Sequence, residues 1–528
     1  MISLKKISHF HIYYIGLILL AINLPLSVFG LSVSQFILAI NWIIEGKFRE
    51  KYDRLRREKS VLIFLVLYLV HILALAYTSW PEGFTGKGYN GLDDLRIKLP
   101  LLLLPIIIGT SQRLTRHQIK TVMLWFTAAV VSSTLISTGI LMGIGNYEIH
   151  DIREISIFLS HIRFSLLINI SIFALAYYLF TEYRKIRQIE RLIYGLIIIW
   201  LIVFLILLQA LTGVTVLVIC SSIFVAFQAY KIRKPALRYA TILIFIGIPI
   251  LVASYVAAKV NDFREFDQIN YNELPASTIN GNPYVHNSKN IQVENGHWVG
   301  LYICQDEMRR EWNKRSELNY DKKDKQEHFL RFTLMRYLTS LNLTKDSAGI
   351  AALGSLDIKA IESGKANHLF NNKFSLYPRI YETIWEIDLY LRGGNPSGHS
   401  VSQRMEYLRA AYGIIEKNPM LGVGTGDLQH AFKQQYIEMD TQLTQHKRLR
   451  AHNQLVTFII AFGFIGFLLI LWALFYPVHL EKKFRNFLFM MVLIIGLISM
   501  FNEDTLETQP GVTFFAFFYC LFLFGQKE

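Results

Sequence analysis

The sequence predicts an all-α integral membrane protein, with about twelve transmembrane helices and one large, mainly helical loop domain outside the cytoplasm. The first observation is composition: the 528 residues are 52% hydrophobic, and a soluble domain this apolar would expose surfaces prone to aggregation. The second is that the apolar residues fall into runs close to the length that a helix needs to cross a bilayer, about 20 residues. The third is the distribution of charge between those runs.

The apolar runs define the predicted spans. Nine of them precede the large loop and three follow it; the fourth is short, and the first two are separated only by a tight connection. The predicted spans lie near residues 11–29, 30–46, 60–78, 98–111, 119–145, 155–180, 192–210, 213–230, 237–258, 452–476, 486–501 and 510–525.

Charged residues in the short loops predict the orientation of these spans. If the N-terminus lies in the cytoplasm, the short loops on that side are all basic; residues 47–59, for example, read KFREKYDRLRREK. The opposing short loops are acidic, and one of them carries Glu503, Asp504 and Glu507. Because basic loops stay on the cytoplasmic side, this pattern predicts that both termini are cytoplasmic.

The chain is thereby divided into three predicted parts. They are an N-terminal transmembrane bundle (1–258), a large periplasmic or extracytoplasmic loop domain (259–451) and C-terminal transmembrane helices (452–528). Within the loop domain, charged and apolar residues alternate in a way that predicts helices over 299–341 and 376–392. The loop domain has a single cysteine, so packing rather than a disulfide must hold it together.

The formal net charge of +14 does not indicate nucleic-acid binding. Most basic residues lie in short loops, where the orientation of the spans explains them, and no basic stretch is interleaved with stacking aromatics as in single-strand binders. The sequence also lacks a ligand cluster with zinc spacing, a serine nucleophile motif and an HExxH motif. We therefore expect no nucleic-acid partner, no metal and no cofactor, with membrane lipids around the spans.

Arg404 is the first candidate site residue. Ser400 and Gln403 form a capping-box pattern, which predicts a helix that starts just after Ser400. Arg404 then lies in the first turn, where free backbone N–H groups and the helix dipole favour an anion, and an arginine fork there suits a diphosphate. The alternative is a surface arginine paired with a carboxylate such as Glu406 or Asp427.

His452 is the second candidate, with Asn453 beside it at the outer start of the tenth predicted span. A histidine at the boundary between water and lipid can accept a proton as a general base. The neighbouring Lys447, Arg448 and Arg450 make the place attractive to an anionic substrate. The alternative is a polar side chain that only anchors the helix at the membrane interface.

Arg163 is unusual because it lies within the sixth predicted span, about 12 Å below its outer end at 1.5 Å per residue. A charge at that depth is costly and usually faces a cavity or a partner. Two other features have structural interpretations. The glycine-rich run 422–426 suits tight packing of a turn against the preceding helix, with a backbone nest for phosphate as the alternative. Asp93-Asp94, followed by basic residues, suits a salt-bridged turn.

The segment from Arg404 through NPMLGVGTGD to RAHNQLVTFIIAFGFIG resembles the O-antigen ligase and polymerase superfamily of bacterial membrane glycosyltransferases. The many spans and the single large loop before the His-Asn segment also match that family. The specific motifs cover about the C-terminal quarter of the chain. The resemblance implies transfer of a glycan from undecaprenyl diphosphate to an acceptor, such as lipid A core in lipopolysaccharide biosynthesis, on the outer face of the inner membrane, without a nucleotide or an obligatory metal.

The resemblance also implies roles for particular residues. His452 becomes the candidate general base and Arg404 the ligand of the donor diphosphate, with Asn453 and Arg450 as possible supporting residues. The family commonly has a further arginine at the outer end of a span that precedes the loop. Here the comparable residues 209–213 read QALTG, without an arginine, and Arg163 is the candidate to replace it.

Other functions remain open at this point. Within the family, the acceptor is either lipid A core, as for a ligase, or another lipid-linked glycan, as for an O-antigen or exopolysaccharide polymerase; a protein acceptor is a third variant. A polysaccharide transporter or flippase is an alternative of another class, but such proteins tend to have paired repeats, which this sequence lacks. A membrane-anchored binding protein would not need Arg163 within a span.

Overall fold

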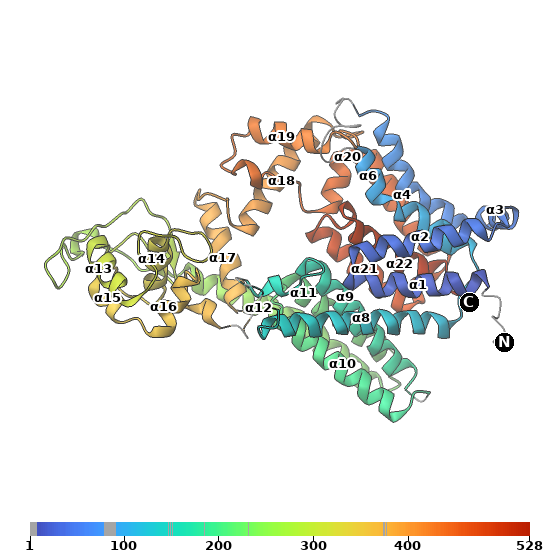
Figure 1. The fold of residues 1–528 in the computed structure, drawn as a ribbon, viewed down its shortest axis with the longest axis horizontal. Helices are drawn as coiled ribbons and strands as arrows, with labels where there is room; N and C mark the ends of the chain where they lie inside the picture. Colours follow the sequence, from blue (N-terminus) through green and yellow to red (C-terminus); the bar gives the residue numbers. More distant parts are fainter. Residues whose placement is uncertain are drawn as a thin grey trace. The chain divides into compact units, whose positions relative to one another are not determined.

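The computed structural model of the protein describes residues 8–78, 91–145, 147, 149, 151–183, 185–230, 232–372, 375 and 377–527. The described chain is mainly helical and forms two compact units (Figure 1). Unit 1 comprises Met1–Tyr147, Arg153–Ile242 and Arg404–Glu528, and unit 2 comprises Glu148–Ile152 and Leu243–Gln403. The residues after unit 2 thus return to the same unit as the N-terminal helices.

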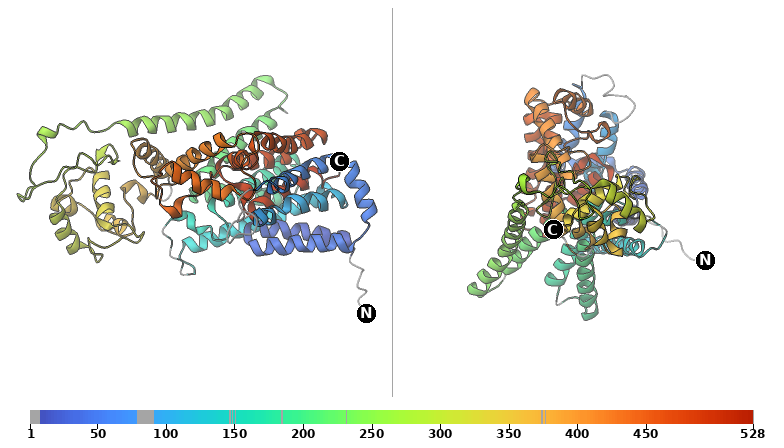
Figure 2. Two further views of the ribbon diagram at one scale, coloured as in Figure 1. Left: turned by 90° about the horizontal axis from the view of Figure 1, so that it is seen from above. Right: turned by 90° about the vertical axis from the view of Figure 1, so that its left-hand side faces the viewer.

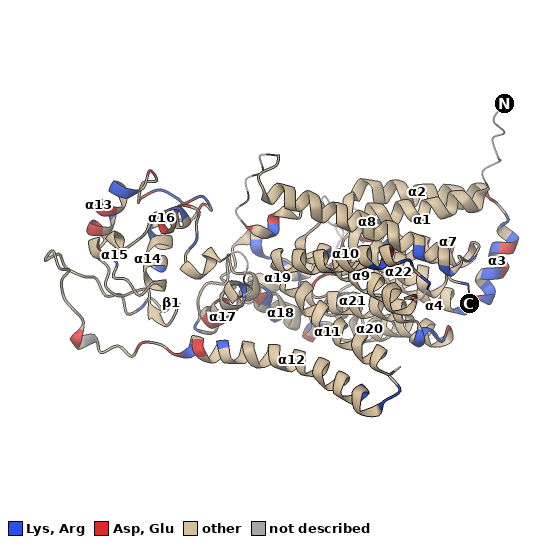
Figure 3. Ribbon diagram, turned by 90° about the horizontal axis from the view of Figure 1, so that it is seen from below, with Lys and Arg blue, Asp and Glu red and all other residues tan. Residues whose placement is uncertain are grey.

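Most helices of unit 1 run side by side as a bundle (Figure 2). Charged residues are sparse along their lengths and gather at their ends and on α3 (Figure 3). The helices that lie wholly in unit 1 are α1 (His9–Leu26), α2 (Val28–Ile44), α3 (Phe48–Arg57), α4 (Lys59–Leu75), α6 (Gly91–Lys98), α7 (Pro100–Thr110), α8 (Arg116–Leu141), α9 (His161–Thr181), α10 (Gln188–Leu207), α11 (Leu211–Ala229), α19 (Leu428–Glu438), α20 (Gln454–Leu480), α21 (Phe487–Asn502) and α22 (Gln509–Leu523). Two further helices, α12 (Pro235–Arg264) and α18 (Ser400–Lys417), lead from one unit into the other.

Seven helices of the described chain are long and apolar enough to cross a membrane, or eight if α2 and α3, which meet at 110°, count as one bent span. Three shorter helices, α4, α21 and α22, are also apolar. Each of the predicted spans contains one observed helix, so the predicted positions agree with the fold. The protein is an α-helical membrane protein; the count of twelve spans and the sidedness of the loops stay predictions.

The C-terminal helices complete the core of unit 1. In α22 all side chains from Val512 to Leu523 are buried, and α22 packs against α7 and α21 while α20 packs against α4. Close to the end of the chain, the N–H of Leu114 donates to Gly525 O over 2.7 Å. The helices that precede unit 2 in the sequence and those that follow it therefore pack into one hydrophobic core.

A break in α20 accommodates the glycine-rich run. Gly463 has φ of +61°, and a Cβ atom there would lie 2.1 Å from Met420 O, so only glycine fits. The N–H groups of Val423 and Gly424 donate to Ile460 O over 2.8 Å and to Ala461 O over 2.9 Å. The run from 422 to 426 therefore packs tightly as a turn, as predicted, but its partner is α20 and not the preceding helix that we expected.

Unit 2 is helical around a separate core that includes Trp312, Tyr337 and Leu338. Its helices are α13 (Gln305–Arg315), α14 (Leu330–Ser340), α15 (Ser347–Ala351), α16 (Ser355–Glu362) and α17 (Tyr377–Leu391). A small hairpin of β1 (Val293–Glu294) and β2 (His297–Trp298) precedes them in the chain. The prediction of α17, ended by glycines, is confirmed. The single helix predicted over 299–341 is wrong, because Asp324 accepts the N–H groups of Gln326 and His328 and forms a turn between α13 and α14.

Candidate functional site

The loop that precedes α20 carries His452, and two tyrosines hold this loop in place. Tyr407 of α18 donates its hydroxyl to Lys447 O over 2.8 Å, and Tyr436 of α19 donates to Leu449 O over 2.6 Å. The rings of Tyr407 and His452 lie 5.5 Å apart with an angle of 31° between their planes. The histidine is therefore supported from one side by a buried aromatic ring.

The backbone of His452 is in a left-handed conformation with φ of +48°. For a residue with a Cβ atom this conformation costs about 1–2 kcal/mol. Asp504 stabilises it, because its Oδ2 accepts the His452 N–H over 3.1 Å and its Oδ1 accepts the Thr457 hydroxyl over 2.8 Å. Asn453, predicted to support the site, caps α20 by accepting the Val456 N–H over 3.1 Å. Strain of this kind is common at functional sites.

Glu503 lies between Arg404 and His452. Arg404 donates from Nη1 to Asn502 Oδ1 over 2.8 Å and from Nη2 to Glu503 Oε1 over 2.7 Å. The other oxygen of Glu503, Oε2, is 3.8 Å from His452 Nδ1, too far for a hydrogen bond. Within the described residues, His452 Nδ1 is buried and has no hydrogen-bond partner. The structure thus brings the two principal predicted site residues to opposite oxygens of one carboxylate.

The position of Arg404 in its helix differs from the prediction. The helix begins at Ser400, so Arg404 is its fifth residue and lies beyond the first turn. The start of α18 already has an anion, because Glu386 Oε2 accepts the Val401 N–H over 2.6 Å. The expectation that Arg404 works together with free N–H groups at a helix start is therefore wrong, and its partners come from the end of α21 instead.

Arg163 also has a different position from the predicted one. Helix α9 begins at His161 with Ser160 as its N-cap, so Arg163 lies in the first turn and not about 12 Å along a span. The cause is that residues 156–160 are not helical and separate α9 from a short 3-10 helix, η1 (Ile152–Ile155). Arg163 interacts electrostatically with Glu503 and Asp504. Its Nε is buried without a hydrogen-bond partner in the described part of the chain.

Two arginines and a histidine act on the Glu503 carboxylate. Burial alone would raise the pKa of Glu503, but His452, Arg404 and Arg163 outweigh burial and hold the pKa below its ordinary value. The side chain of Glu503 is only 13% exposed. An ionised, mostly buried carboxylate therefore lies at the centre of the candidate residues.

Residues 209–213, where the sequence lacks an arginine, join this site through polar contacts. The Asn502 amide that accepts from Arg404 donates its N–H to the Thr212 hydroxyl. Gly213 allows α11 to approach α9 closely, because a Cβ atom there would lie 2.4 Å from Ser165 Cβ. The start of α11 therefore lies against the first turns of α9, which carry Arg163.

Arg450 belongs to a neighbouring ion cluster. Its Nη1 donates to Glu507 Oε2 over 2.8 Å, and Lys98 Nζ donates to the same oxygen over 3.0 Å. Burial works against ionisation of Glu507, but Lys98 and Arg450 prevail and its pKa lies well below the ordinary value. Lys98 also pairs with Asp94, which confirms the predicted ion pairing, although these residues lie in helix α6 and not in a turn. Arg450 thus fixes the loop before His452 and does not point to an open anion site.

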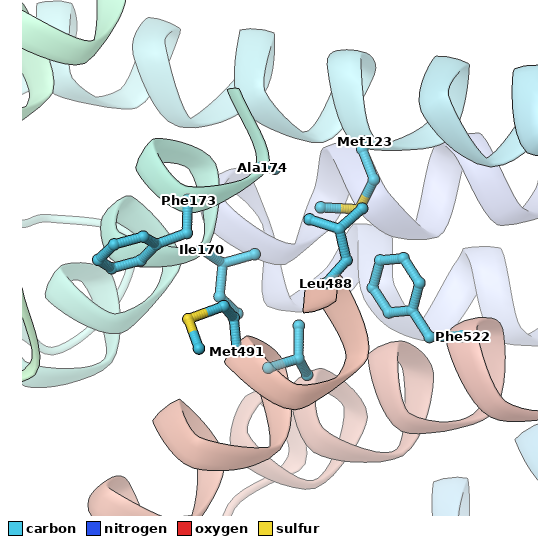
Figure 4. Close-up of a pocket in the computed structure, with 8 residues that line it drawn as sticks. Met123, Ile170, Phe173, Ala174, Leu488, Met491 and Phe522 are labelled. Carbon is cyan, nitrogen blue, oxygen red and sulfur yellow. The ribbon is translucent and has the colours of Figure 1, made fainter. Parts of the chain in front are cut away.

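The sequence interpretation missed Asn502, Glu503 and Asp504 as members of the site. Their signal was the acidic run NEDTLE at 502–507, which we used only for the orientation of the spans. An apolar pocket elsewhere in unit 1 contributes nothing to the chemistry, because it offers no polar group (Figure 4). Its lining residues are Met123, Ile170, Phe173, Ala174, Leu488, Met491, Val492 and Phe522.

The fold and the site define a helical membrane protein with arginines and a histidine around a buried carboxylate. In a comparison with protein families, residues 369–471 match the O-antigen ligase family. This match supports a relation of the segment to the O-antigen ligase superfamily, whose members are glycosyltransferase-like ligases and polymerases. The segment includes Arg404, Arg450, His452 and Asn453, whereas Arg163 and Glu503 lie outside it. No curated protein matches the chain.

Proposed function

We propose that the protein is a metal-independent glycosyltransferase of the ligase type. It moves a glycan from undecaprenyl diphosphate to an acceptor, lipid A core or a similar glycan, on the outer face of the bacterial inner membrane. The observation that carries the proposal is the convergence of Arg404 and His452 on the two oxygens of Glu503, within 2.7 and 3.8 Å. That arrangement supports a role for Arg404 as the cation that receives the leaving phosphate and for His452 as the base of an acceptor hydroxyl.

The leaving group determines what the arginines do. As the bond between the anomeric carbon and the phosphate oxygen breaks, its electron pair stays on the diphosphate and negative charge grows there. Arg404, and Arg163 as the second cation, stabilise this charge in a partly buried site, where a single preorganised donor contributes about 10²–10³-fold to the rate. The guanidinium fork suits phosphate oxygens because it donates two parallel hydrogen bonds.

His452 acts on the acceptor. Its Nδ1 faces Glu503, and the imidazole is 31% exposed, so Nε2 is the nitrogen available to an acceptor hydroxyl. The acceptor oxygen attacks the anomeric carbon, its proton passes to His452, and the nearby carboxylate stabilises the imidazolium. A positioned base of this kind contributes about 10²–10⁴-fold.

The test is a transfer assay with the full-length protein in lipid nanodiscs, a polyprenyl-diphosphate-linked glycan as donor and a lipid A core acceptor. We choose His452→Asn, because asparagine tolerates the left-handed conformation of this residue and the fold should survive. Transfer should fall by at least about 10²-fold. The matched control is His446→Asn in the same loop, which should keep the wild-type rate.

Two outcomes contradict the proposal. One is a wild-type rate in His452→Asn, and the other is a wild-type protein that transfers no glycan to either a core or a lipid-linked acceptor. The length of the products separates the two family activities: a chain transferred once to lipid A core identifies a ligase, whereas growth of the lipid-linked chain identifies a polymerase.

A further inference from the structure

Glu503 already occupies the place where the proposed function requires a phosphate. Its Oε1 accepts from the Arg404 Nη2 over 2.7 Å, and its side chain is 13% exposed. Carboxylate and phosphate oxygens are equivalent partners for a guanidinium fork. A diphosphate and a carboxylate cannot both take the same N–H group, and two anions in a partly buried site repel each other.

The two residues that flank Glu503 are held by their side chains. Asn502 donates to the Thr212 hydroxyl, and Asp504 accepts from the His452 N–H and the Thr457 hydroxyl. A change of position when another anion arrives therefore needs only a rotation of the Glu503 side chain. Its Oε2 is 3.8 Å from His452 Nδ1, so a shift of about 1 Å would bring the two atoms within hydrogen-bond distance.

We propose that Glu503 is an internal counter-anion, which holds Arg404 in the substrate-free protein and is displaced toward His452 when the donor diphosphate binds. This inference rests on the proposed function, because it concerns the same donor site. The displaced carboxylate exchanges Arg404 for His452 as its partner, and in doing so it orients the imidazole only once the donor is bound. Glu503 is a positioning residue in this scheme, since it touches neither the donor nor the acceptor.

The decisive variant is Glu503→Gln. The amide oxygen of glutamine can still accept from Arg404, so the contact that orders the arginine is kept, while the competing negative charge is removed. Binding of a diphosphate should therefore become tighter by about tenfold, because a like charge next to the ligand is lost. The turnover number should fall at the same time, because His452 loses its anionic partner. A purely structural role for Glu503 would not tighten binding.

The measurement is isothermal titration of inorganic pyrophosphate into the full-length protein in nanodiscs, together with the donor KM and kcat of each variant. The control is Glu438→Gln, which removes one negative charge from an exposed pair with Lys417. We expect tighter pyrophosphate binding and a lower donor KM for Glu503→Gln, and wild-type values for Glu438→Gln. An unchanged or weaker affinity in Glu503→Gln would overturn the inference.

One further variant separates this inference from the proposed function. Arg404→Gln should bind pyrophosphate more weakly than the wild type. If it binds equally well, the donor site itself is misplaced and the proposed function fails. If Arg404→Gln weakens binding but Glu503→Gln does not strengthen it, only the counter-anion inference fails.

Discussion

Two buried carboxylates, Glu307 in unit 2 and Glu503 in unit 1, are satisfied in different ways. In unit 2, Glu307 is 1% exposed and accepts from the Thr278 hydroxyl over 2.6 Å, the Asn282 amide over 2.6 Å and the Ser347 N–H over 3.0 Å. All of these donors are neutral. Burial works against ionisation of Glu307, but the hydrogen bonds outweigh burial and lower its pKa to about 2.

The carboxylate of Glu503 in unit 1 has different neighbours. Arg404 lies at one of its oxygens and His452 near the other, and Arg163 is a second arginine that acts on it. Within the described residues, buried nitrogens of His452 and Arg163 lack hydrogen-bond partners, and His452 has a strained backbone. A carboxylate that neutral donors satisfy contributes to the stability of the fold, whereas unsatisfied buried donors need an explanation, and the proposed donor diphosphate supplies one for His452 and Arg163. This contrast makes separate predictions for the two carboxylates.

The largest effect should come from Arg404→Gln in unit 1. Transfer should fall by about 10²–10³-fold, because the leaving diphosphate loses a donor in the transition state. Arg404→Lys should recover only part of the rate, since a single ammonium cannot replace the fork to Asn502 and Glu503. The transfer assay measures both. Arg409→Gln on the same helix is the control, because Arg409 is 66% exposed, and equal losses in Arg404→Gln and Arg409→Gln would contradict a site-specific role.

Arg163 should contribute less than Arg404. We expect Arg163→Gln to lower kcat by about 10–10²-fold with a smaller change in donor KM, because a second cation stabilises mainly the charge that develops in the transition state. Arg163→Lys should keep most of the activity. Donor turnover that is intact in Arg163→Gln would show that Arg163 does not replace the arginine missing from residues 209–213.

The sequence predicted the helices better than the contacts between them. Apolar periodicity located a helix in each predicted span, and the local pattern of glycines at 422–426 and of charges at 93–98 correctly indicated packing and ion pairs. The helices and the ion pair of Asp94 with Lys98 depend on residues close together in the chain, whereas the partner of the glycine-rich turn, at Ile460 and Ala461, does not. The ends of α13 and α14 were missed because the charged and apolar alternation continues through the turn at Asp324.

The partners of Arg404 could not be predicted, because they come from the end of α21, about a hundred residues later in the sequence. Capping rules describe one helix end, and here Glu386 of another helix satisfies the start of α18. Hence the sequence predicted Arg404 and His452 as separate candidates. Only the fold shows that one carboxylate joins them.

Glu307 in unit 2 tests the other half of the comparison. A substitution of this carboxylate should change the stability of the fold and leave pyrophosphate binding unchanged. Glu307→Gln should lower the free energy of local unfolding by about 1–3 kcal/mol, because hydrogen bonds from buried donors are weakened. The stability that Glu307 contributes is present above its ordinary pKa of 4.5 and is lost as pH falls toward about 2. Hydrogen exchange of α13 measures both effects. The exposed Glu317→Gln is the control, and a loss of pyrophosphate binding in Glu307→Gln would break the distinction between the units.

A substitution of Lys345 should give the smallest effect, and it should stabilise unit 2, whereas Glu307→Gln should destabilise it. It is 2% exposed, its Nζ donates to Trp298 O over 3.1 Å, and burial lowers its pKa to about 8. A lysine with a lowered pKa in the folded state binds fewer protons there than in the unfolded chain, so stability rises with pH between about 8 and 10.5.

Replacing this ammonium group should therefore stabilise unit 2 at neutral pH. Lys345→Met keeps the apolar stem and should raise the free energy of unfolding at pH 7 by about 1 kcal/mol. The N–H of Cys304 donates to Lys345 O over 2.8 Å, so the labelling rate of this buried thiol reports local opening. Labelling at pH 7 should be slower in Lys345→Met than in the wild type or in the exposed Lys322→Met. At pH values near 10 the difference should shrink, and a difference that persists there would show that charge is not the cause.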